Sequence, residues 1–432
     1  MNRFVRIVTV AFVTLLIVFV FMVFWVEAAA EDAWITKAPV PSTVWGVAAA
    51  NGKIYAFARN ITYEYDPLAD VWTTKNHLPF SMYGHALAVY QNKIYIFESD
   101  GRTYVYDPAT DTWETKTPMP TPRTQLTANV VNGKIYLIGG RTGGQYTITA
   151  LNEVYDIATD SWTTKASIPN PVTLYASAVV DGKIYIIGGQ NEFTQSVNLA
   201  LVQIYDPATD TWSFGAPIPK IVWNAAAIAT TGVWAPKRIY VIGGIPDKSM
   251  DGTTLNQVYN PENDSWTLGK SMPTARFQLH VAVVNDMIYA MGGLPYFNLH
   301  GIWCPENEQY TPMGYGTVPP AVAVISPENA TYNATSVSLV FTVNKPVVWM
   351  GYSLDGQETV TIIGNTTLAG LANGVHNITV YARDEFGNTG ASEPITFSIE
   401  TPFPILLIAT VSGIAVLIIG IGFSIYYKKH CK

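Results

Sequence analysis

The chain has 432 residues, which is too long for one small hydrophobic core and predicts two or more folded units. Its formal net charge is −7, only 13 % of its residues are charged, and no basic run occurs outside the two ends. Phosphate binding needs clustered Lys and Arg side chains, so this composition argues against nucleic acid as a partner.

Residues 1–30 are typical of a secretory signal. Arg3 and Arg6 form a basic start, residues 7–26 are predominantly apolar, and the alanines at 28–30 fit a cleavage site. Because the apolar stretch is long for a cleaved signal, an uncleaved signal anchor is the alternative.

A set of sequence marks then recurs about every 40 to 55 residues, which is typical of a repeat architecture. Each copy has an apolar run ending in Ile-Tyr, at Tyr55, Tyr95, Tyr136, Tyr185, Tyr240 and Tyr289. Each copy also has a tyrosine followed seven residues later by a tryptophan: Tyr65/Trp72, Tyr106/Trp113, Tyr155/Trp162, Tyr205/Trp212, Tyr259/Trp266 and a degenerate sixth pair, Trp303/Tyr310.

Residues 123–163 show how one copy is built. An apolar inner strand leads to a two-residue turn at Asn132-Gly133, and residues 134–140 return as the second strand. A loop precedes the third strand near Tyr155, and a tight turn precedes the outermost strand, which begins near Trp162. Four antiparallel strands repeated radially predict the blades of a β-propeller.

The repeat resembles the kelch β-propeller family, over about residues 33–315. This resemblance implies an all-β ring, for which we predict six blades with seven as the alternative. Residues 33–37 look like an outer strand that precedes any complete copy. We expect them to pair into the last blade and close the ring, with the Tyr310 strand displaced or serving as the exit.

The aromatic pairs are expected to pack between neighbouring blades, because each large ring buries substantial area. Platforms for sugar rings are the less favoured reading. Asp107 and Asp111 have a spacing that could suggest a calcium loop, but we expect them to cap their own turn.

From residue 318 the repeat stops, and the sequence pattern changes to six or seven short predicted strands separated by Gly, Asn and Pro turns. This pattern predicts an immunoglobulin-like or fibronectin-like β-sandwich over residues 318–400, with Trp349 as its buried aromatic. The segment loosely resembles modules that precede the membrane anchor in archaeal and bacterial surface proteins. The propeller itself is then assigned to residues 31–317.

Residues 404–427 are predicted to form a transmembrane helix. Residues 405–426 contain no charge and would span roughly 33 Å as a helix, about one hydrocarbon core. Lys428, Lys429 and Lys432 follow at once, which predicts that the tail at 428–432 is cytoplasmic and that the region between the two apolar segments is extracellular. Of the two cysteines, Cys304 and Cys431, only the first falls in that region, so no disulfide is expected.

Potential glycosylation sites agree with an extracellular assignment. Six asparagines head an Asn-x-Ser/Thr triplet: Asn60, Asn263, Asn329, Asn333, Asn365 and Asn377. Four of them fall between residues 329 and 379, which is the density of a glycosylated stalk.

Function is expected on the propeller face that carries the long loops between second and third strands, near the mouth of the central channel. The candidate binding residues are the aromatic and polar groups at the entry to each inner strand: Trp45, Tyr83, His85, Arg123, Gln125, Tyr175, Trp223, Arg276, Gln278 and His280. Aromatic faces with a few hydrogen-bonding groups suit a carbohydrate or a peptide. The alternative is that these side chains plug the channel, with Arg123 and Arg276 bracing the adjacent blade.

We therefore predict a single-pass surface protein that binds a carbohydrate or another surface protein. The alternative is an extracellular sugar-modifying enzyme of the epimerase or mutarotase type, for which Glu98 and Asp247 are possible acid–base groups that nothing selects. Similarity to galactose oxidase would imply a copper site, but Cys304 fills the position of Asp in the Tyr-Asp-Pro motif and the histidines are scattered. No cofactor, metal or catalytic residue is predicted.

Overall fold

The computed structural model describes residues 30–82, 85–142, 147–191, 198–246, 249–296 and 303–401. The predicted transmembrane helix and all but the last residue of the predicted signal lie outside these ranges. Within the described ranges, no helix combines the length and the apolar character needed to span a membrane. The chain divides into two compact units, Met1–Val318 and Pro319–Lys432.

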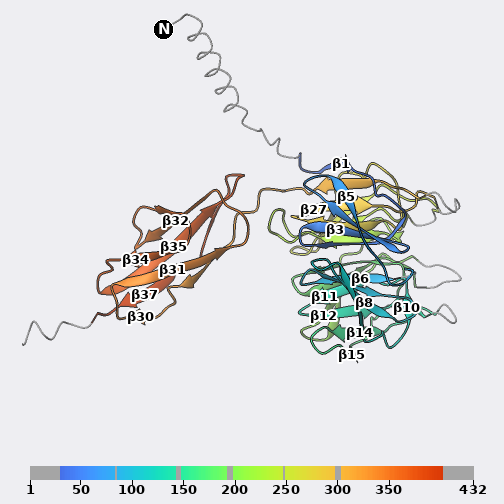
Figure 1. Ribbon diagram of the computed structural model, residues 1–432, viewed down its shortest axis with the longest axis horizontal. Coiled ribbons are helices and arrows are strands. Elements are labelled where there is room, and N and C mark those ends of the chain that lie inside the picture. The colour runs from blue at the N-terminus through green and yellow to red at the C-terminus, as the bar shows by residue number, and fades with distance from the viewer. Residues whose placement is uncertain are drawn as a thin grey trace, which may run out of the picture. The chain divides into compact units, whose positions relative to one another are not determined.

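Six four-stranded antiparallel sheets make up most of the described part of the first unit (Figure 1). From the inside outward, sheet 1 contains β2 (Val44–Ala50), β3 (Lys53–Ala58), β4 (Ile61–Asp66) and β5 (Val71–His77), and sheet 2 contains β6 (Ala86–Tyr90), β7 (Lys93–Phe97), β8 (Thr103–Asp107) and β9 (Thr112–Lys116). Sheet 3 contains β11 (Ala128–Val131), β12 (Lys134–Ile138), β14 (Asn152–Asp156) and β15 (Ser161–Thr164), and sheet 4 contains β16 (Ala176–Val180), β17 (Lys183–Ile187), β18 (Val202–Asp206) and β19 (Thr211–Gly215).

Sheet 5 contains β21 (Ala226–Ala229), β22 (Ile239–Ile242), β24 (Asn256–Asn260) and β25 (Ser265–Leu268), and sheet 6 contains β26 (His280–Val284), β27 (Met287–Met291), β28 (Asn307–Thr311) and β1 (Ala33–Lys37). Two short pairs lie outside these sheets: β10 (Arg123–Thr124) with β13 (Arg141–Thr142), and β20 (Val222–Trp223) with β23 (Ile245–Pro246). Each inner strand contacts the inner strand of the next sheet, and β26 contacts β2. The six inner strands therefore form a closed ring.

The local sequence explains why each sheet forms. Asn132 and Gly133 have φ angles of 48° and 72°, as a two-residue hairpin turn of the Asn-Gly type requires. The second strand of each sheet is buried on both sides, so it consists almost entirely of apolar residues. In β3, for example, Ile54, Ala56 and Phe57 have no exposed surface.

The prediction that residues 33–37 join the last sheet is confirmed. β1 pairs with β28, and Trp34 lies opposite Tyr310 just as Trp72 lies opposite Tyr65. The predicted pair Trp303/Tyr310 is therefore wrong, because Tyr310 is the tyrosine of the sixth pair and Trp34 is its tryptophan. The Tyr310 strand is not displaced: β28 is the third strand of sheet 6.

The position predicted for Cys304 is also wrong. Its backbone nitrogen donates to Gly293 O (3.0 Å), as Thr149 does to Gly140 O (3.0 Å) in sheet 3. Cys304 therefore lies in the segment that leads into the third strand, before the tyrosine. Its thiol is buried, and burial raises the pKa of that thiol to about 11.

A tyrosine–aspartate link joins each sheet to the preceding one. The aspartate that follows each third-strand tyrosine has a positive φ near 50°, and the sixth aspartate is supplied by Asp32 ahead of β1. The tyrosine hydroxyls donate to these carboxylates over 2.5–2.7 Å, in the pairs Tyr65–Asp70, Tyr106–Asp111, Tyr155–Asp160, Tyr205–Asp210, Tyr259–Asp264 and Tyr310–Asp32.

Each of these carboxylates also accepts a backbone N–H from the end of the preceding sheet. Asp210 Oδ1 accepts from Ala166 N at 2.9 Å, and Asp32 Oδ1 accepts from Lys270 N at 2.5 Å. The expectation that both aspartates of the Asp-Pro-x-x-Asp motif cap their own turn holds only for the first: Asp107 accepts from Ala109 N at 3.0 Å. The second aspartate is an inter-sheet link.

The aromatic rings pack between neighbouring sheets, as predicted. Within a sheet, the paired tyrosine and tryptophan rings lie 4.8–5.2 Å apart. The second-strand tyrosine of each sheet then approaches the third-strand tyrosine of the next, with centroids 5.6–6.2 Å apart, in the pairs Tyr55–Tyr106, Tyr95–Tyr155, Tyr136–Tyr205, Tyr185–Tyr259, Tyr240–Tyr310 and Tyr289–Tyr65. This repetition stabilises every junction in the same way.

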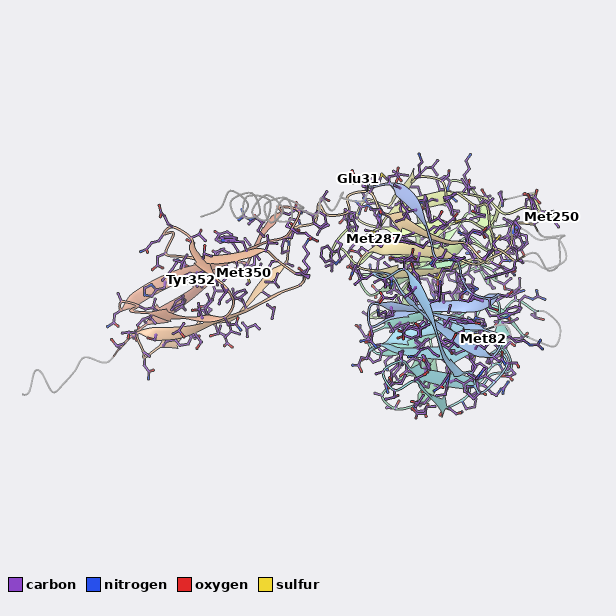
Figure 2. All side chains as sticks on the ribbon, turned by 45° about the horizontal axis from the view of Figure 1, so that its top comes forward. Glu31, Met82, Met250, Met287, Met350 and Tyr352 are labelled. Atoms are coloured by element: carbon purple, nitrogen blue, oxygen red, sulfur yellow. The ribbon has the colours of Figure 1, made fainter. Side chains whose placement is uncertain are left out.

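The second unit is a pair of sheets around an apolar core of its own. One sheet has the order β29 (Val322–Ser326), β31 (Ser336–Val343), β34 (Thr366–Ala369). The other has the order β30 (Thr331–Tyr332), β37 (Ile395–Ile399), β35 (Gly374–Arg383), β32 (Trp349–Leu354), β33 (Val360–Ile362), with β36 (Thr389–Ala391) pairing β35. Met350 and Tyr352 lie on β32 and are partly buried against this core (Figure 2).

The prediction that Trp349 is the buried aromatic of the second unit is wrong. Trp349 is only partly buried, its indole nitrogen donates to Thr361 Oγ1 (3.1 Å), and the Arg383 guanidinium lies 5.2 Å from its ring centroid. Phe341 and Phe397 are the buried aromatic side chains of this core. Trp349 begins its strand, where it reaches the surface.

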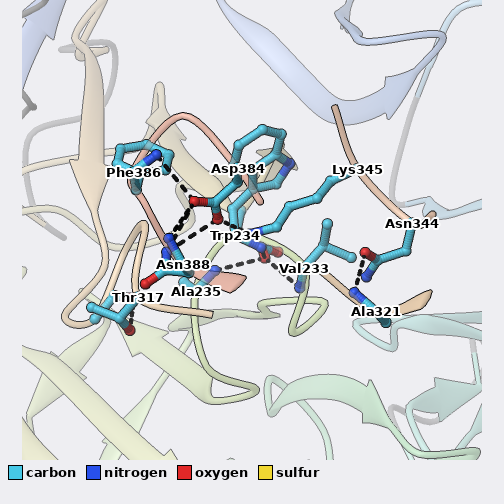
Figure 3. A network of polar contacts seen from close by, with 12 residues as sticks. Val233, Trp234, Ala235, Thr317, Ala321, Asn344, Lys345, Asp384, Phe386 and Asn388 are labelled. Carbon is cyan, nitrogen blue, oxygen red and sulfur yellow. Dashed lines mark hydrogen bonds and ion pairs between the residues drawn. The ribbon is translucent and has the colours of Figure 1, made fainter. Parts of the chain in front are cut away.

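Each unit also contains a buried carboxylate that fixes irregular backbone (Figure 3). In the first unit, Asp286 accepts from the backbone nitrogens of Val233, Trp234 and Ala235 at 2.8–3.2 Å. In the second unit, Asp384 pairs with Lys345 at 2.8 Å, and both side chains have no exposed surface. These contacts supply partners for polar groups in loops that form few strand hydrogen bonds of their own.

Candidate functional site

A cavity of about 890 Å³ runs along the inner strands of the first unit. Its wall takes residues from all six inner strands, β2, β6, β11, β16, β21 and β26. Most of the wall is alanine, valine and other small side chains, because six strands that converge on one axis leave little room for larger ones. A cavity of this size can hold a small ligand or the end of a chain.

One end of the cavity is framed by a series of backbone hydrogen bonds. Leu174 N donates to Gln125 O (3.2 Å), Asn224 N to Leu174 O (2.8 Å), and Gln278 N to Asn224 O (3.0 Å). All four residues have φ between 50° and 58°. This left-handed conformation turns the chain from the connection between two sheets into the inner strand that follows. The hydrogen bonds between these residues link sheets 3 to 6 at the cavity mouth.

The long loops begin at the same end. Arg141, which opens the long loop of sheet 3, donates from its guanidinium to Gln125 Oε1 (3.1 Å). Leu294, at the start of the loop of sheet 6, exchanges backbone hydrogen bonds of 2.9 Å with Phe277 and lines the cavity. The cavity mouth and the bases of the long loops therefore form one surface.

Two histidines from different sheets lie against the start of β2. His85 of sheet 2 interacts with the backbone of Trp45, and His280 of sheet 6 interacts with the backbone of Val44. Gly46 lets His85 approach this strand closely, because a Cβ at this position would lie 2.2 Å from Leu87 Cδ1 and 2.7 Å from His85 Nε2. Burial lowers the pKa of His85 to about 3, with a further contribution from His280, and burial lowers the pKa of His280 to about 4.

Three polar side chains interrupt the alanine wall on sheets 3 and 4. Thr127 and Ser177 hydroxyls lie 2.5 Å apart, Ser177 Oγ donates to Asn129 Oδ1 (2.8 Å), and Asn129 Nδ2 donates to Thr127 Oγ1 (3.4 Å). All three line the cavity. Sequence reasoning missed them, although polar residues within an inner strand of otherwise small apolar residues were the available signal.

The structure brings together six of the ten predicted binding residues: Trp45, His85, Gln125, Tyr175, Gln278 and His280 line the cavity. Trp45 has 40 % of its surface exposed, and Gln278 is also exposed. Trp223 pairs with Ile245 in the short β20–β23 sheet and does not line the cavity. Tyr83 lies outside the described residues.

Tyr175 lines the cavity but is already engaged by the protein. Its side chain is buried, its hydroxyl donates to Ile138 O, and it accepts from Thr127 N (3.3 Å). The ring therefore joins sheets 3 and 4. Its hydroxyl therefore has a structural role, and contact of the ring with a ligand stays a prediction.

Arg123 and Arg276 are not exposed at the mouth, which corrects their assignment as binding residues. The Arg123 side chain has no exposed surface and pairs with Glu153 at 2.9 Å. Its guanidinium also donates to Gly139 O (3.0 Å) and Leu151 O (3.3 Å). All of these partners belong to sheet 3, so Arg123 braces its own sheet.

Arg276 repeats this arrangement in sheet 6. Its guanidinium pairs with Glu308 and donates to Gly292 O (2.9 Å) and Glu306 O (3.0 Å). Thr274 Oγ1 donates to the other carboxylate oxygen of Glu308 (2.8 Å). The guanidinium is therefore enclosed and unable to reach a ligand.

The remaining predicted sites fall outside the cavity. Glu98 is buried and does not line it, and Asp247 lies outside the described residues. Among the residues that the structure describes, no three His, Cys, Asp or Glu side chains gather as metal ligands would. All six asparagines of the potential glycosylation sites, named above, are exposed.

Comparison with known proteins gives the family and the fold. Residues 43–244 and 98–293 each match the KLHDC2/KLHL20/DRC7 Kelch-repeats domain, and together these matches cover more than half of the chain. Kelch-like protein 15 of Homo sapiens is 38 % identical over 64 residues, 14 % of this chain and 11 % of that protein.

Halomucin of Haloquadratum walsbyi is 34 % identical over 93 residues, 20 % of this chain and 1 % of that protein. The chain thus spans a small fraction of either relative. A solved structure titled "Structure of YjhT" superposes with a TM-score of 0.52 at 16 % identity, covering 62 % of this chain and 95 % of its own, which shows a shared fold.

Proposed function

Because the chain belongs to the kelch-repeat family, we propose that its first unit is a six-bladed propeller that binds a ligand at the loop-side mouth of its channel. The ligand is a carbohydrate or a segment of another surface protein. The single observation that carries this proposal is the cavity of about 890 Å³, whose mouth combines the exposed Trp45 with hydrogen-bonding side chains at the loop bases. Kelch propellers are scaffolds for such loops, and the site decides the function.

The proposal includes a place at the cell surface. The basic, apolar and small-residue pattern of residues 1–30 supports export, and the uncharged stretch at 405–426 followed by lysines supports an anchor with a cytoplasmic tail. Exposure of all six glycosylation-type asparagines is compatible with glycans on both units. In this proposal the second unit is an immunoglobulin-like spacer between the propeller and the membrane.

Trp45 provides the test. An exposed indole contributes contact area to a sugar or peptide without a large loss of conformational freedom, so its removal should weaken binding by about 1–3 kcal/mol, or roughly 5- to 150-fold. The measurement is binding of the full-length protein, in detergent, to glycan and peptide arrays. Wild type is compared with Trp45→Ala and Gln278→Ala.

Phe214→Ala is the matched control. Phe214 is another exposed aromatic, 55 % exposed, but it lies on β19, the outermost strand of sheet 4. We expect Trp45→Ala and Gln278→Ala to lose the wild-type hits and Phe214→Ala to keep them. Hits that survive both mouth substitutions unchanged would show that the ligand binds elsewhere.

A further inference from the structure

No residue described in the cavity wall is Asp, Glu, Lys or Arg. The chain has 25 Lys and Arg and 32 Asp and Glu residues, so this absence is a property of the wall and not of the composition. Many of the charges lie instead where the second strand begins and the third strand ends, and ion pairs such as Lys93–Asp107 (2.9 Å) repeat there from sheet to sheet. The charged groups nearest to the mouth are already held by the protein: Arg123–Glu153 and Arg276–Glu308 are sealed inside sheets 3 and 6. The buried Arg141 donates to Gln125 Oε1 (3.1 Å).

The wall's two histidines are held neutral by their surroundings. His85 Nδ1 is buried without a hydrogen-bond partner, so protonating both ring nitrogens would leave a buried N–H unpaired. The groups that act on these rings are the backbone at Trp45 and the His280 ring for His85, and the backbone at Val44 for His280; none of them is an acid. Burial keeps the pKa of both rings well below neutral.

The wall has one polar side and several apolar ones. Thr127, Ser177 and Asn129 present hydroxyl and amide groups from sheets 3 and 4. Sheets 1, 2 and 5 present mainly apolar side chains, such as Ala48, Ala86 and Ala226. A neutral molecule with hydroxyls on one edge and C–H groups on the other can replace its water hydrogen bonds here, whereas an ion would lose hydration without meeting an opposite charge.

We propose that the channel selects uncharged, hydroxylated groups, such as the neutral end of a saccharide, and excludes carboxylates and ammonium groups. This inference rests on the ligand site proposed above and adds its chemical class. Selection comes from desolvation: hydrogen bonds to Thr127, Ser177 or Asn129 can replace those that a neutral hydroxyl makes with water, whereas a charge would also need a counter-charge, which the described wall does not offer.

The test compares pairs of related sugars, with one uncharged and one charged member in each pair. Full-length protein in detergent is titrated with glucose and glucuronate, galactose and galacturonate, and N-acetylglucosamine and glucosamine at pH 7, with binding measured by calorimetry or saturation-transfer NMR. We expect at least one neutral member to bind, and its charged partner to bind about 100-fold more weakly, because a buried unpaired charge carries a large desolvation penalty.

Two variants test whether the wall hydroxyls and the absence of charge cause this selection. Thr127→Val removes a wall hydroxyl at nearly constant shape and should weaken the neutral sugar about 5- to 10-fold, whereas Thr115→Val on the exposed strand β9 should not. Gln278→Lys adds a cation at the exposed mouth. It should raise the ratio of the affinity for the acidic sugar to the affinity for its neutral partner about tenfold. Circular dichroism checks that each variant folds.

The outcomes separate this inference from the proposed function. An acidic or amino sugar that binds wild type as tightly as its neutral partner overturns charge selection but leaves a ligand site at the mouth. If no sugar of any pair binds, the inference that the channel takes neutral sugars is also overturned. In that case the array comparison of Trp45→Ala with Phe214→Ala still decides whether the mouth binds a peptide.

Discussion

Replacing Asp32 with alanine tests how the N-terminal strand closes the ring. Asp32 Oδ1 accepts from the Tyr310 hydroxyl (2.7 Å) and from Lys270 N (2.5 Å). Tyr310 is fully buried, so its hydroxyl would lose its acceptor, and an unmet buried donor costs about 1–3 kcal/mol. The more exposed bond to Lys270 adds about 0.5–1 kcal/mol. We expect Asp32→Ala to lower the free energy of unfolding by about 1.5–4 kcal/mol.

Asp210→Ala is the matched substitution at an internal junction. Asp210 accepts from Tyr205 (2.6 Å) and Ala166 N (2.9 Å), so the local loss should be similar. Denaturant unfolding followed by tryptophan fluorescence measures both. Hydrogen exchange should additionally show faster opening of β1 and β28 in Asp32→Ala only, because β1 is attached to the rest of sheet 6 only through β28.

A double-mutant cycle with Tyr310→Phe separates the link from other effects. If the hydroxyl and the carboxylate act on each other, the double variant should lose less stability than the two single variants added together, by about 1 kcal/mol or more. Additive losses, or a loss below about 0.5 kcal/mol in Asp32→Ala with unchanged exchange in β1, would refute the proposed role of the link.

Three further predictions concern stability. Glu308→Gln should cost about 3–5 kcal/mol in denaturant unfolding, because Arg276 would remain buried without its carboxylate, and Glu153→Gln should do the same in sheet 3; losses under about 1 kcal/mol would contradict this. Hydrogen bonds from Tyr205 and Ala166 N lower the pKa of Asp210, and those from Tyr259 and Ala216 N lower the pKa of Asp264. The stability they contribute is therefore present above about pH 4 and lost as the pH falls, so Asp210→Asn/Asp264→Asn should flatten the acid side of a plot of Tm against pH. In the second unit, Ala372 O and Asp355 raise the pKa of His376, so its contribution is full below about pH 6.5 and declines as the pH rises through the folded pKa. Scanning calorimetry of His376→Gln should show that this decline is gone, and an unchanged alkaline decline would reject the assignment.

The repeat could be predicted from sequence because its marks are local, but the register of the last copy could not be seen from those marks. Tyr310 was assigned as an outer-strand aromatic because its tryptophan lies more than 270 residues away, at Trp34. A signal was nevertheless present. Asp32-Ala33-Trp34 repeats the Asp-x-Trp spacing of Asp70 and Trp72, so a search for that triplet would have placed Tyr310 correctly.

The buried arginines show why the candidate site was harder to predict. Arg123 and Arg276 lie two residues before the mouth residues Gln125 and Gln278, and sequence position alone does not say whether a side chain points to solvent or into the sheet. The informative signal was a pairing across each copy. Glu153 and Glu308 occur only in the two copies that carry the arginine, whereas Gln203 and Gln257 stand at that position in sheets 4 and 5.

The neutral channel is the central claim, and the imidazoles of His85 and His280 report on it directly. The measurement is a pH titration of their 15N chemical shifts, with His376 as the internal reference. The account predicts that both channel rings remain neutral down to about pH 5, while His376, whose pKa is raised, becomes protonated well above that pH. Channel histidines that titrate near pH 6.5, as free imidazoles do, would contradict an uncharged wall and the ligand class inferred from it.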